Sequence, residues 1–104
     1  MYIAHYIQVR IKMKTNSITR KFGKLLRIDV TYDNQIESIK ITGDFFIHPE
    51  DTLDQIVAEL KGISLPFQAD LVTRKINYII HNNETEMIGI TVDDIVTTLG
   101  EVLQ

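Results

Sequence analysis

The 104-residue sequence contains no cysteine, which excludes disulfides, thiolate metal ligands, cysteine nucleophiles and thiolate-bound iron–sulfur clusters. It also lacks any apolar run close to the ~20 residues that a transmembrane helix requires. The N-terminal residues alternate apolar and polar side chains instead of forming the apolar block of a signal peptide. These absences lead us to expect a cytoplasmic protein.

Acidic residues are missing from the first 27 positions, which nonetheless hold seven of the eleven Lys and Arg residues. Residues 28–104 hold all 14 Asp and Glu residues, and the whole chain has a formal net charge of -3. Such an asymmetry often marks a surface that contacts an anionic partner. The composition, 44% hydrophobic and 24% charged, is typical of an ordinary globular protein, and the length predicts one domain over residues 1–104.

Alternating apolar and polar side chains predict three strands in the first half of the chain, over residues 5–14, 24–33 and 36–42. The polar residues 15–23 are expected to form a turn or loop. Asp33-Asn34-Gln35 is expected to be a tight turn, and the phase of Glu37 indicates a bulge near it. Strands joined by such short links form an antiparallel meander with one face free for helices.

The second half of the chain is expected to be helical. Gly43-Asp44-Phe45-Phe46 ends the meander, and Pro49 suits the first position of a helix that Gly62 terminates. Apolar stripes predict a second helix over residues 68–81 and a third over residues 91–103, with Thr91 as its N-cap. A three-stranded meander followed by about three helices on one face indicates an α+β fold, not a doubly wound parallel sheet.

Several kinds of catalytic motif are absent. There is no glycine-rich phosphate loop, and no serine lies in a nucleophile motif. His5, His48 and His81 lie on three different expected elements, so a shared metal site is not expected. Most acidic residues lie in helix first turns, where the helix dipole explains them. The sequence therefore does not indicate a self-sufficient enzyme.

Two local sequences remain as candidate binding sites. Residues 19–24 form a basic stretch that is either a solvated loop or a contact for a phosphate or an acidic surface. In Gly43-Asp44-Phe45-Phe46, adjacent phenylalanines point to opposite sides of an extended chain, so one of them faces a helix seam or a partner. Asp44 has a simpler interpretation, in which it caps or closes a turn.

These same segments resemble a known family. Gly23-Lys24-Leu25-Leu26-Arg27 and Ile41-Thr42-Gly43-Asp44-Phe45-Phe46, followed by the helix near residues 53–62, are similar to the C-terminal accessory domain of lipoate–protein ligases. The resemblance covers roughly residues 20–103. In some archaea and bacteria that domain is a separate polypeptide, and the length of this chain matches such a free-standing small subunit of a two-component ligase.

The resemblance implies an activity that depends on a partner. The catalytic subunit, the expected partner in a heterodimer, holds the lipoate pocket, and the accessory domain is needed to form lipoyl-AMP from lipoate and ATP before transfer to lipoyl-domain lysines. ATP, Mg and lipoate are thus expected in the complex, with no cofactor bound by this chain alone. The acceptor lipoyl domain is an indirect partner, and no membrane is involved. The resemblance also implies the fold of iron–sulfur scaffold and sulfur-acceptor proteins, although the lack of cysteine excludes scaffold chemistry.

Combining the local sequences with the resemblance, we expect no catalytic residue and no metal ligand in this chain. The basic side chains are predicted to face the catalytic subunit or its ATP phosphates, and the two phenylalanines to contribute to docking. The candidate residues facing the partner or a phosphate are Arg20, Lys21, Gly23, Lys24, Gly43, Asp44, Phe45 and Phe46.

Two other functions stay open on the sequence alone. The basic first quarter, with Tyr2, Tyr6 and Phe22 nearby, would suit a nucleic-acid-binding module. The acidic sequence pI of about 5.5 and the absence of a single-strand-binding motif argue against nucleic acid as a partner. The second alternative is a cysteine-free adaptor that shares the scaffold-like fold but has unrelated partners.

Overall fold

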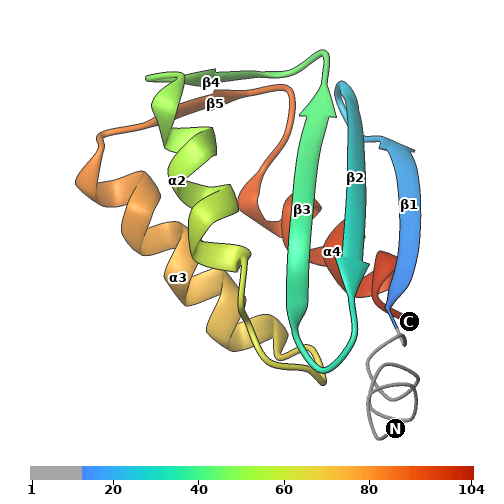
Figure 1. Cartoon of the computed structure of the whole chain (residues 1–104). Helices are drawn as coiled ribbons and strands as arrows, with labels where there is room; N and C mark the ends of the chain where they lie inside the picture. Colours follow the sequence, from blue (N-terminus) through green and yellow to red (C-terminus); the bar gives the residue numbers. More distant parts are fainter. Residues whose placement is uncertain (1–12) are drawn as a thin grey trace, which may run out of the picture.

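The computed structural model describes residues 13–104, so most of the strand expected over residues 5–14 lies outside the described residues. Figure 1 shows a three-stranded sheet with helices behind it and a two-stranded ribbon at one end. The elements in chain order are β1 (Lys14–Lys21), β2 (Leu25–Tyr32), β3 (Ile36–Gly43), β4 (Phe46–His48), α2 (Asp51–Leu60), α3 (Ala69–Asn82), β5 (Glu86–Ile88) and α4 (Val92–Val102).

The sheet is the predicted antiparallel meander, with β2 between β1 and β3. Ile18, Ile28 and Ile41 lie side by side in register across its three strands. The register between β2 and β3 shifts next to the Asp33 turn, which confirms the predicted bulge. In that turn the Asp33 amide donates to the Gln35 carbonyl over 3.0 Å.

The prediction of a loop over residues 15–23 is wrong. Strand β1 occupies most of this segment, and only a short link remains before β2. The strand is exposed at every position except the half-buried Ile18. Since it lies at the edge of the sheet, it shows no apolar alternation from which a strand could be predicted. Its Thr residues nonetheless have high β propensity, and β2 supplies a partner for each position.

The helices all pack on one face of the sheet, which confirms the α+β arrangement. Helix α4 lies against β1 and β2, and α2 lies against β3 (Figure 1). The side chains fully buried between sheet and helices include Leu26, Ile28, Ile56, Leu60, Val72, Ile76, Ile95 and Leu99. Among residues 13–104, no helix packs on the opposite face of the sheet. The more specific similarity to the iron–sulfur scaffold fold stays a prediction.

The helix boundaries are mostly those expected. Thr91 caps α4 in a capping box, in which its hydroxyl accepts from the Asp94 amide and the Asp94 carboxylate accepts from the Thr91 amide. Pro49 is not the first residue of a helix: α2 begins at Asp51, and the Pro49 carbonyl accepts from the Thr52 amide in the preceding turn. No helix among residues 13–104 is long and apolar enough to span a membrane.

The ribbon of β4 and β5 was not predicted. Phe46, Ile47 and His48 pair with Ile88, Met87 and Glu86, although two helices separate the two strands in the sequence. Strands of three residues are too short to show a periodic pattern, and neither would form without the other. The expectation that residues after the meander become helical at once is therefore wrong.

Candidate functional site

Three chain segments meet at one end of the molecule, where the hairpin from β1 to β2, the end of β3 and the end of β5 come together (Figure 1). We call this region the glycine junction and define it as residues 21–25, 43–46 and 88–89. The Lys24 amide donates to the Gly89 carbonyl over 3.0 Å, and the Asp44 amide donates to the Leu25 carbonyl over 3.3 Å. Each of the three segments is thus bonded to another through the main chain.

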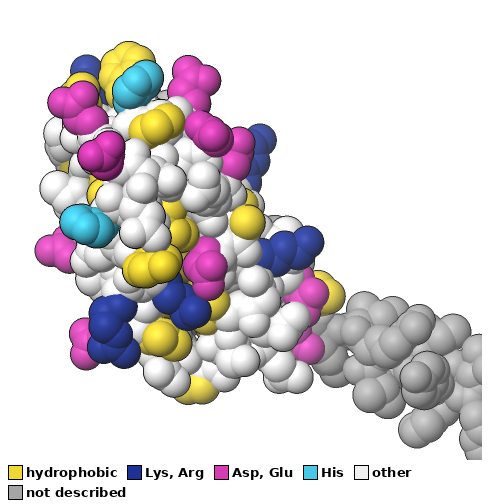
Figure 2. Space-filling model, turned by 90° about the vertical axis from the view of Figure 1, so that its left-hand side faces the viewer, with side chains coloured by type: hydrophobic (Ala, Val, Ile, Leu, Met, Phe, Trp, Pro, Cys, Tyr) yellow, Lys and Arg dark blue, Asp and Glu magenta, His cyan; other side chains and the backbone are white. Residues whose placement is uncertain are grey.

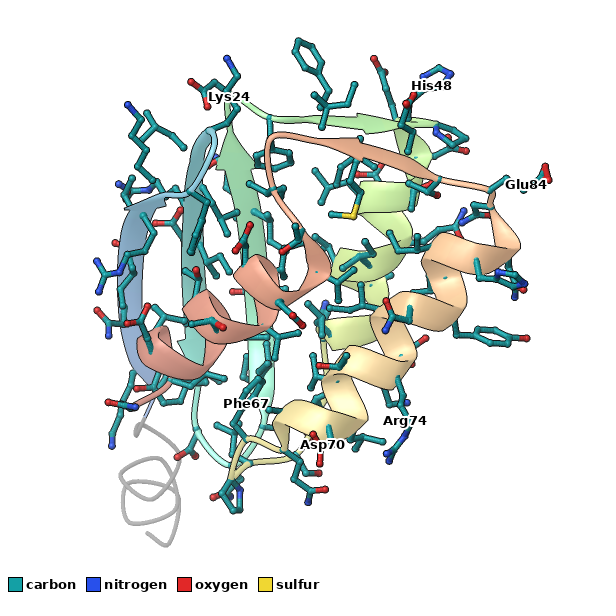
Figure 3. All side chains as sticks on the ribbon, turned by 180° about the vertical axis from the view of Figure 1, so that it is seen from behind. Lys24, His48, Phe67, Asp70, Arg74 and Glu84 are labelled. Atoms are coloured by element: carbon teal, nitrogen blue, oxygen red, sulfur yellow. The ribbon has the colours of Figure 1, made fainter. Side chains whose placement is uncertain are left out.

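Gly89 sets the position of Lys24. Its φ of +97° lies in the left-handed region, which glycine adopts without strain. A Cβ atom at this position would overlap Cγ of Lys24, so the aliphatic stem of the lysine lies directly on the glycine. Figure 3 shows Lys24 at this end of the molecule, where its side chain is exposed. The junction therefore presents an ammonium group on a stem that is fixed at its base.

Gly43 and Asp44 join the end of β3 to the start of β2. A Cβ atom at Gly43 would overlap the Leu25 carbonyl oxygen, so only glycine permits this approach. The Asp44 Oδ1 atom accepts a short hydrogen bond of 2.6 Å from the Leu25 amide. Asp44 thus ties two strands together, which agrees with the simpler interpretation of this residue as one that closes a turn.

The two adjacent phenylalanines face opposite ways, as the alternation of an extended chain predicts. Phe45 is half-buried and packs against the core, whereas Phe46 is 66% exposed. Across the ribbon from Phe46 lies Ile88, which is 51% exposed. Figure 2 shows hydrophobic side chains spread over this face, with one group at the top, the end where β4 and β5 lie, beside a histidine and acidic side chains. Phe46 is therefore the member of the pair that is available to a partner.

Sequence reasoning missed two apolar residues of this region, Leu25 and Ile88. Leu25 is 44% exposed, and the argument applied to the phenylalanines could have found it, because Leu25 and Leu26 are also adjacent in a strand. Leu26 is buried, so Leu25 must point outward. No sequence signal marks Ile88, since its exposure depends on the pairing of two very short strands.

The predicted basic residues separate into two groups. Lys21 lies opposite Leu25 in the register of β1 and β2, so it lies at the same end of the sheet as Lys24. Arg20 is directed instead to the helix layer, where its Nε lies 3.2 Å from Oε1 of Glu101 on α4. The structure thus brings together Lys21, Gly23, Lys24, Gly43, Asp44, Phe45 and Phe46 and leaves Arg20 apart.

A shallow groove lies beside the junction. It has a volume of about 320 Å³ and runs between the end of β3, strand β4 and the start of α2. Phe45, Phe46 and Leu53 supply apolar walls, and Glu50 lies at its edge. A wider groove of about 510 Å³, between α4 and the connector near Phe67, lies elsewhere and contains none of the predicted site residues.

One ion pair lies on the helix-free face of the sheet. Arg27 donates from Nε and Nη2 to the two carboxylate oxygens of Asp29, at 3.0 and 2.9 Å. These hydrogen bonds raise the pKa of Arg27 and lower the pKa of Asp29 from their ordinary values. Both charges are compensated by each other, so the pair is not a free binding site for an anion.

The glycine junction presents exposed side chains that can bind a partner. Its exposed groups are the ammonium groups of Lys21 and Lys24 and the apolar side chains of Leu25, Phe46 and Ile88. Among residues 13–104 no cluster of three or more His, Asp or Glu side chains is arranged to hold a metal ion. The surface therefore suits contact with an anionic and apolar partner surface.

The aromatic residues considered for nucleic-acid binding do not form a common platform in the described structure. Phe22 is half-buried and packs against the core. Tyr2 and Tyr6 lie outside the described residues. The basic-face nucleic-acid module therefore gains no support.

Comparisons with known proteins find similarity to lipoate–protein ligases. No model of a known protein family matches the chain. A 49-residue region is 37% identical to "Lipoate-protein ligase A subunit 2" from Thermoplasma acidophilum, and the match covers 46% of this chain. The chain spans about half, 52%, of the length of that curated relative.

The fold has a wider match than the sequence. It is similar to a chain in the solved structure of an archaeal lipoylation system, described as a bi-partite lipoate protein ligase and its E2 lipoyl domain from Thermoplasma acidophilum. The match has a TM-score of 0.66 and 25% sequence identity, and it covers 85% of this chain and 94% of the other. Both comparisons confirm the resemblance to two-component lipoate–protein ligases that the sequence indicates.

Proposed function

We propose that this chain is the accessory subunit of a two-component lipoate–protein ligase and acts with a separate catalytic subunit in the ATP-dependent formation of lipoyl-AMP. The observation that carries the proposal is the match of nearly the whole fold to a chain of a bi-partite lipoate protein ligase. The sequence match to subunit 2 of such an enzyme supports it independently of the fold.

A physical reason connects the accessory role with the first half-reaction. Lipoyl-AMP forms when the lipoate carboxylate attacks the α-phosphorus of ATP and pyrophosphate leaves as the bond between the α- and β-phosphates breaks. Both reactants are anionic. A subunit that closes over the catalytic site excludes water and fixes the geometry of the two reactants, which can supply a large part of the rate gain. Transfer of the lipoyl group to an acceptor lysine uses an already activated intermediate, so it depends less on such a cover.

The glycine junction is the surface through which this chain acts in the proposal. Lys21 and Lys24 meet an acidic surface of the catalytic subunit or the phosphates of its ATP, and Phe46 contributes apolar contact. Arg20 is no longer part of this group, because Glu101 holds it on the other side of β1.

Magnesium would be held by the catalytic subunit and ATP. The acidic side chain within the junction is Asp44, and one of its oxygens already accepts from the Leu25 amide. Two or more free carboxylates or phosphate oxygens are the usual ligands of this ion. The residues of the junction therefore do not fit a magnesium site, and this chain contributes position and charge instead.

Reconstitution tests the proposal. Purified catalytic subunit is incubated with ATP, Mg and lipoate, with or without the full chain, and lipoyl-AMP is measured by mass spectrometry. We expect the intermediate to form faster with the chain present, while transfer from pre-formed lipoyl-AMP to a lipoyl domain changes less. Equal amounts of lipoyl-AMP with and without the chain would refute the proposal.

Charge reversal separates the junction from general charge effects. The double variant Lys21→Glu/Lys24→Glu should weaken complex formation or lipoyl-AMP synthesis at moderate ionic strength. The matched control is Lys61→Glu/Arg74→Glu, which makes the same charge change at two exposed positions, the C-cap of α2 and helix α3. Figure 3 shows Arg74 far from Lys24. If both double variants weaken binding or lipoyl-AMP synthesis equally, the glycine junction is not the surface through which the chain acts.

A further inference from the structure

The exposed apolar residues of the chain are concentrated at one end. Among residues 13–104 the large hydrophobic side chains that are exposed are Met13, Leu25, Phe46, Tyr78 and Ile88. Three of these five, Leu25, Phe46 and Ile88, lie in the glycine junction, whereas Tyr78 is isolated on α3 and Met13 precedes β1. Contiguous apolar surface of this kind typically marks an interaction site, whereas single exposed residues do not.

The ribbon of β4 and β5 has two different faces. On the inner face, Ile47 is buried and its partner Met87 packs against the core. On the outer face, Phe46 pairs with Ile88 next to the junction, while the pair farther from it, His48 and Glu86, is polar. An outer ribbon face that met only water would be expected to carry polar side chains. An apolar cross-strand pair there therefore indicates that another surface covers it.

Positive charge borders this apolar pair on the junction side. Lys21 and Lys24 are exposed, and neither makes an ion pair within residues 13–104. Asp44, the acid within the junction, accepts a hydrogen bond from the Leu25 amide. Two further acids, Glu86 on β5 and Glu50 at the groove, border the apolar pair on the side away from β1. The complementary surface is consequently an apolar recess with acidic groups along one side.

We infer that the outer face of the β4–β5 ribbon is the element that docks the catalytic subunit, with Phe46 and Ile88 as its anchors. This inference rests on the proposed function. Phe46 enters an apolar recess of the catalytic subunit, Lys21 and Lys24 meet acidic groups beside the recess, and the 320 Å³ groove next to Phe46 receives an apolar side chain in return. The set of docking residues expected from the sequence changes accordingly: Ile88 replaces Phe45, which packs against the core.

A second copy of this chain is a poorer occupant of the same surface. A two-fold symmetric contact is formed by the same patch on both subunits. It would bring both pairs of Lys21 and Lys24 into one interface, while Asp44 of each copy stays engaged within its own junction. Like charges placed together in an interface are costly. A partner with its own acidic groups avoids this repulsion.

Two outward-facing substitutions test the inference. Phe46→Ala and Ile88→Thr remove the anchors without creating a cavity in the core, and threonine keeps the β propensity of the strand. Tyr78→Ala is the control, because Tyr78 is 68% exposed and so nearly matches Phe46. Isothermal titration of the full-length chain into the catalytic subunit gives the dissociation constant of each variant. Circular dichroism of every variant confirms that its fold is retained.

We expect the dissociation constant to rise about tenfold or more for each anchor variant and to change by less than about twofold for Tyr78→Ala. In the lipoyl-AMP assay, the concentration of chain needed for half-maximal rate should rise in parallel. The maximal rate at saturating chain should stay close to that of the wild type, because the anchors hold the subunit in place and do not contact the reacting atoms.

Failure of this inference can be distinguished from failure of the proposed function. If the wild-type chain stimulates lipoyl-AMP formation but both anchor variants bind as tightly as it does, docking occurs elsewhere and the inference is overturned. If the variants change only the self-association of the isolated chain in analytical ultracentrifugation, a second copy covers the ribbon and the inference is likewise overturned. If the wild-type chain binds the catalytic subunit without stimulating lipoyl-AMP formation, the proposed function fails, whereas the anchor effect on binding still stands.

Discussion

Replacing Gly89 by alanine tests whether the glycine junction positions Lys24. The backbone at Gly89 has a φ of +97°, where an L residue is strained by about 1–2 kcal/mol. The new methyl group would also overlap Cγ of Lys24 and lie 2.9 Å from its Cβ. Relieving that overlap requires the base of the Lys24 side chain to move, and overpacking of this kind adds about 1–3 kcal/mol.

Gly62→Ala is a closely matched control. Gly62 has a φ of +91°, so the backbone strain from alanine is nearly the same as at Gly89. A Cβ atom there would meet no other atom within 4 Å. The difference between the two variants in the free energy of unfolding, measured with urea on the full-length chain, therefore isolates the contact with Lys24. We expect Gly89→Ala to be destabilised by at least about 1 kcal/mol more than Gly62→Ala.

A double variant makes the test sharper. Lys24→Ala removes the stem that the new methyl group would strike, so Gly89→Ala should cost less stability in that background, with a coupling energy of about 1 kcal/mol. In the reconstituted assay, Gly62→Ala should support lipoyl-AMP formation like the wild type, while Gly89→Ala should be impaired because Lys24 is displaced. Equal costs for the two glycine variants, together with no coupling to Lys24→Ala, would refute the idea that Gly89 seats the lysine.

Three further outcomes follow from the described contacts. The Thr98 hydroxyl is buried and makes no hydrogen bond within residues 13–104, so Thr98→Val should be neutral or stabilising by up to about 1 kcal/mol in urea unfolding. A loss of stability would show that the hydroxyl does have a partner. Thr91→Ala removes half of the capping box with Asp94 and should cost about 1 kcal/mol, with faster amide hydrogen exchange in the first turn of α4. The bond to Arg27 lowers the pKa of Asp29, so the pair stabilises the fold above the ordinary carboxyl pKa of about 3.9, and this contribution disappears as the pH falls through the lowered value. Asp29→Asn should therefore be slightly less stable than the wild type at pH 7, and the gap should close in strong acid; a gap that stays constant with pH would contradict this assignment.

The parts of the fold that the sequence predicts are those with a strong local pattern. The strand from Leu25 to Tyr32 and the helix beginning after Thr91 were found because each buries one regular face and carries a turn or cap signal. The helix α3 was found by its apolar stripe, with Val72 and Ile76 among its buried residues. In each case burial and periodicity coincide, so local reasoning is sufficient.

The parts that were missed depend on partners distant in the sequence. Strand β1 is polar and exposed, and it exists because β2 offers it a full set of hydrogen bonds. Strands β4 and β5 have three residues each and are stabilised only by each other and by the core beneath Ile47. The ion pair of Arg20 with Glu101 could not be predicted for the same reason, because the two residues are 81 positions apart and no sequence pattern links them.

The residues that carry the resemblance to lipoate–protein ligases also share a physical role, which bears on what the chain does. Gly43 admits the Leu25 carbonyl, Asp44 bonds the Leu25 amide, and Lys24 packs on Gly89. Most of the residues in the two similar segments thus hold three chain segments together. The side chains left free by this arrangement are basic or apolar and point away from the core. Sequence segments that build a fixed surface fit the proposed role of this chain, which is to bind and position a catalytic partner. We expect the contact with that partner to be strongest at Phe46.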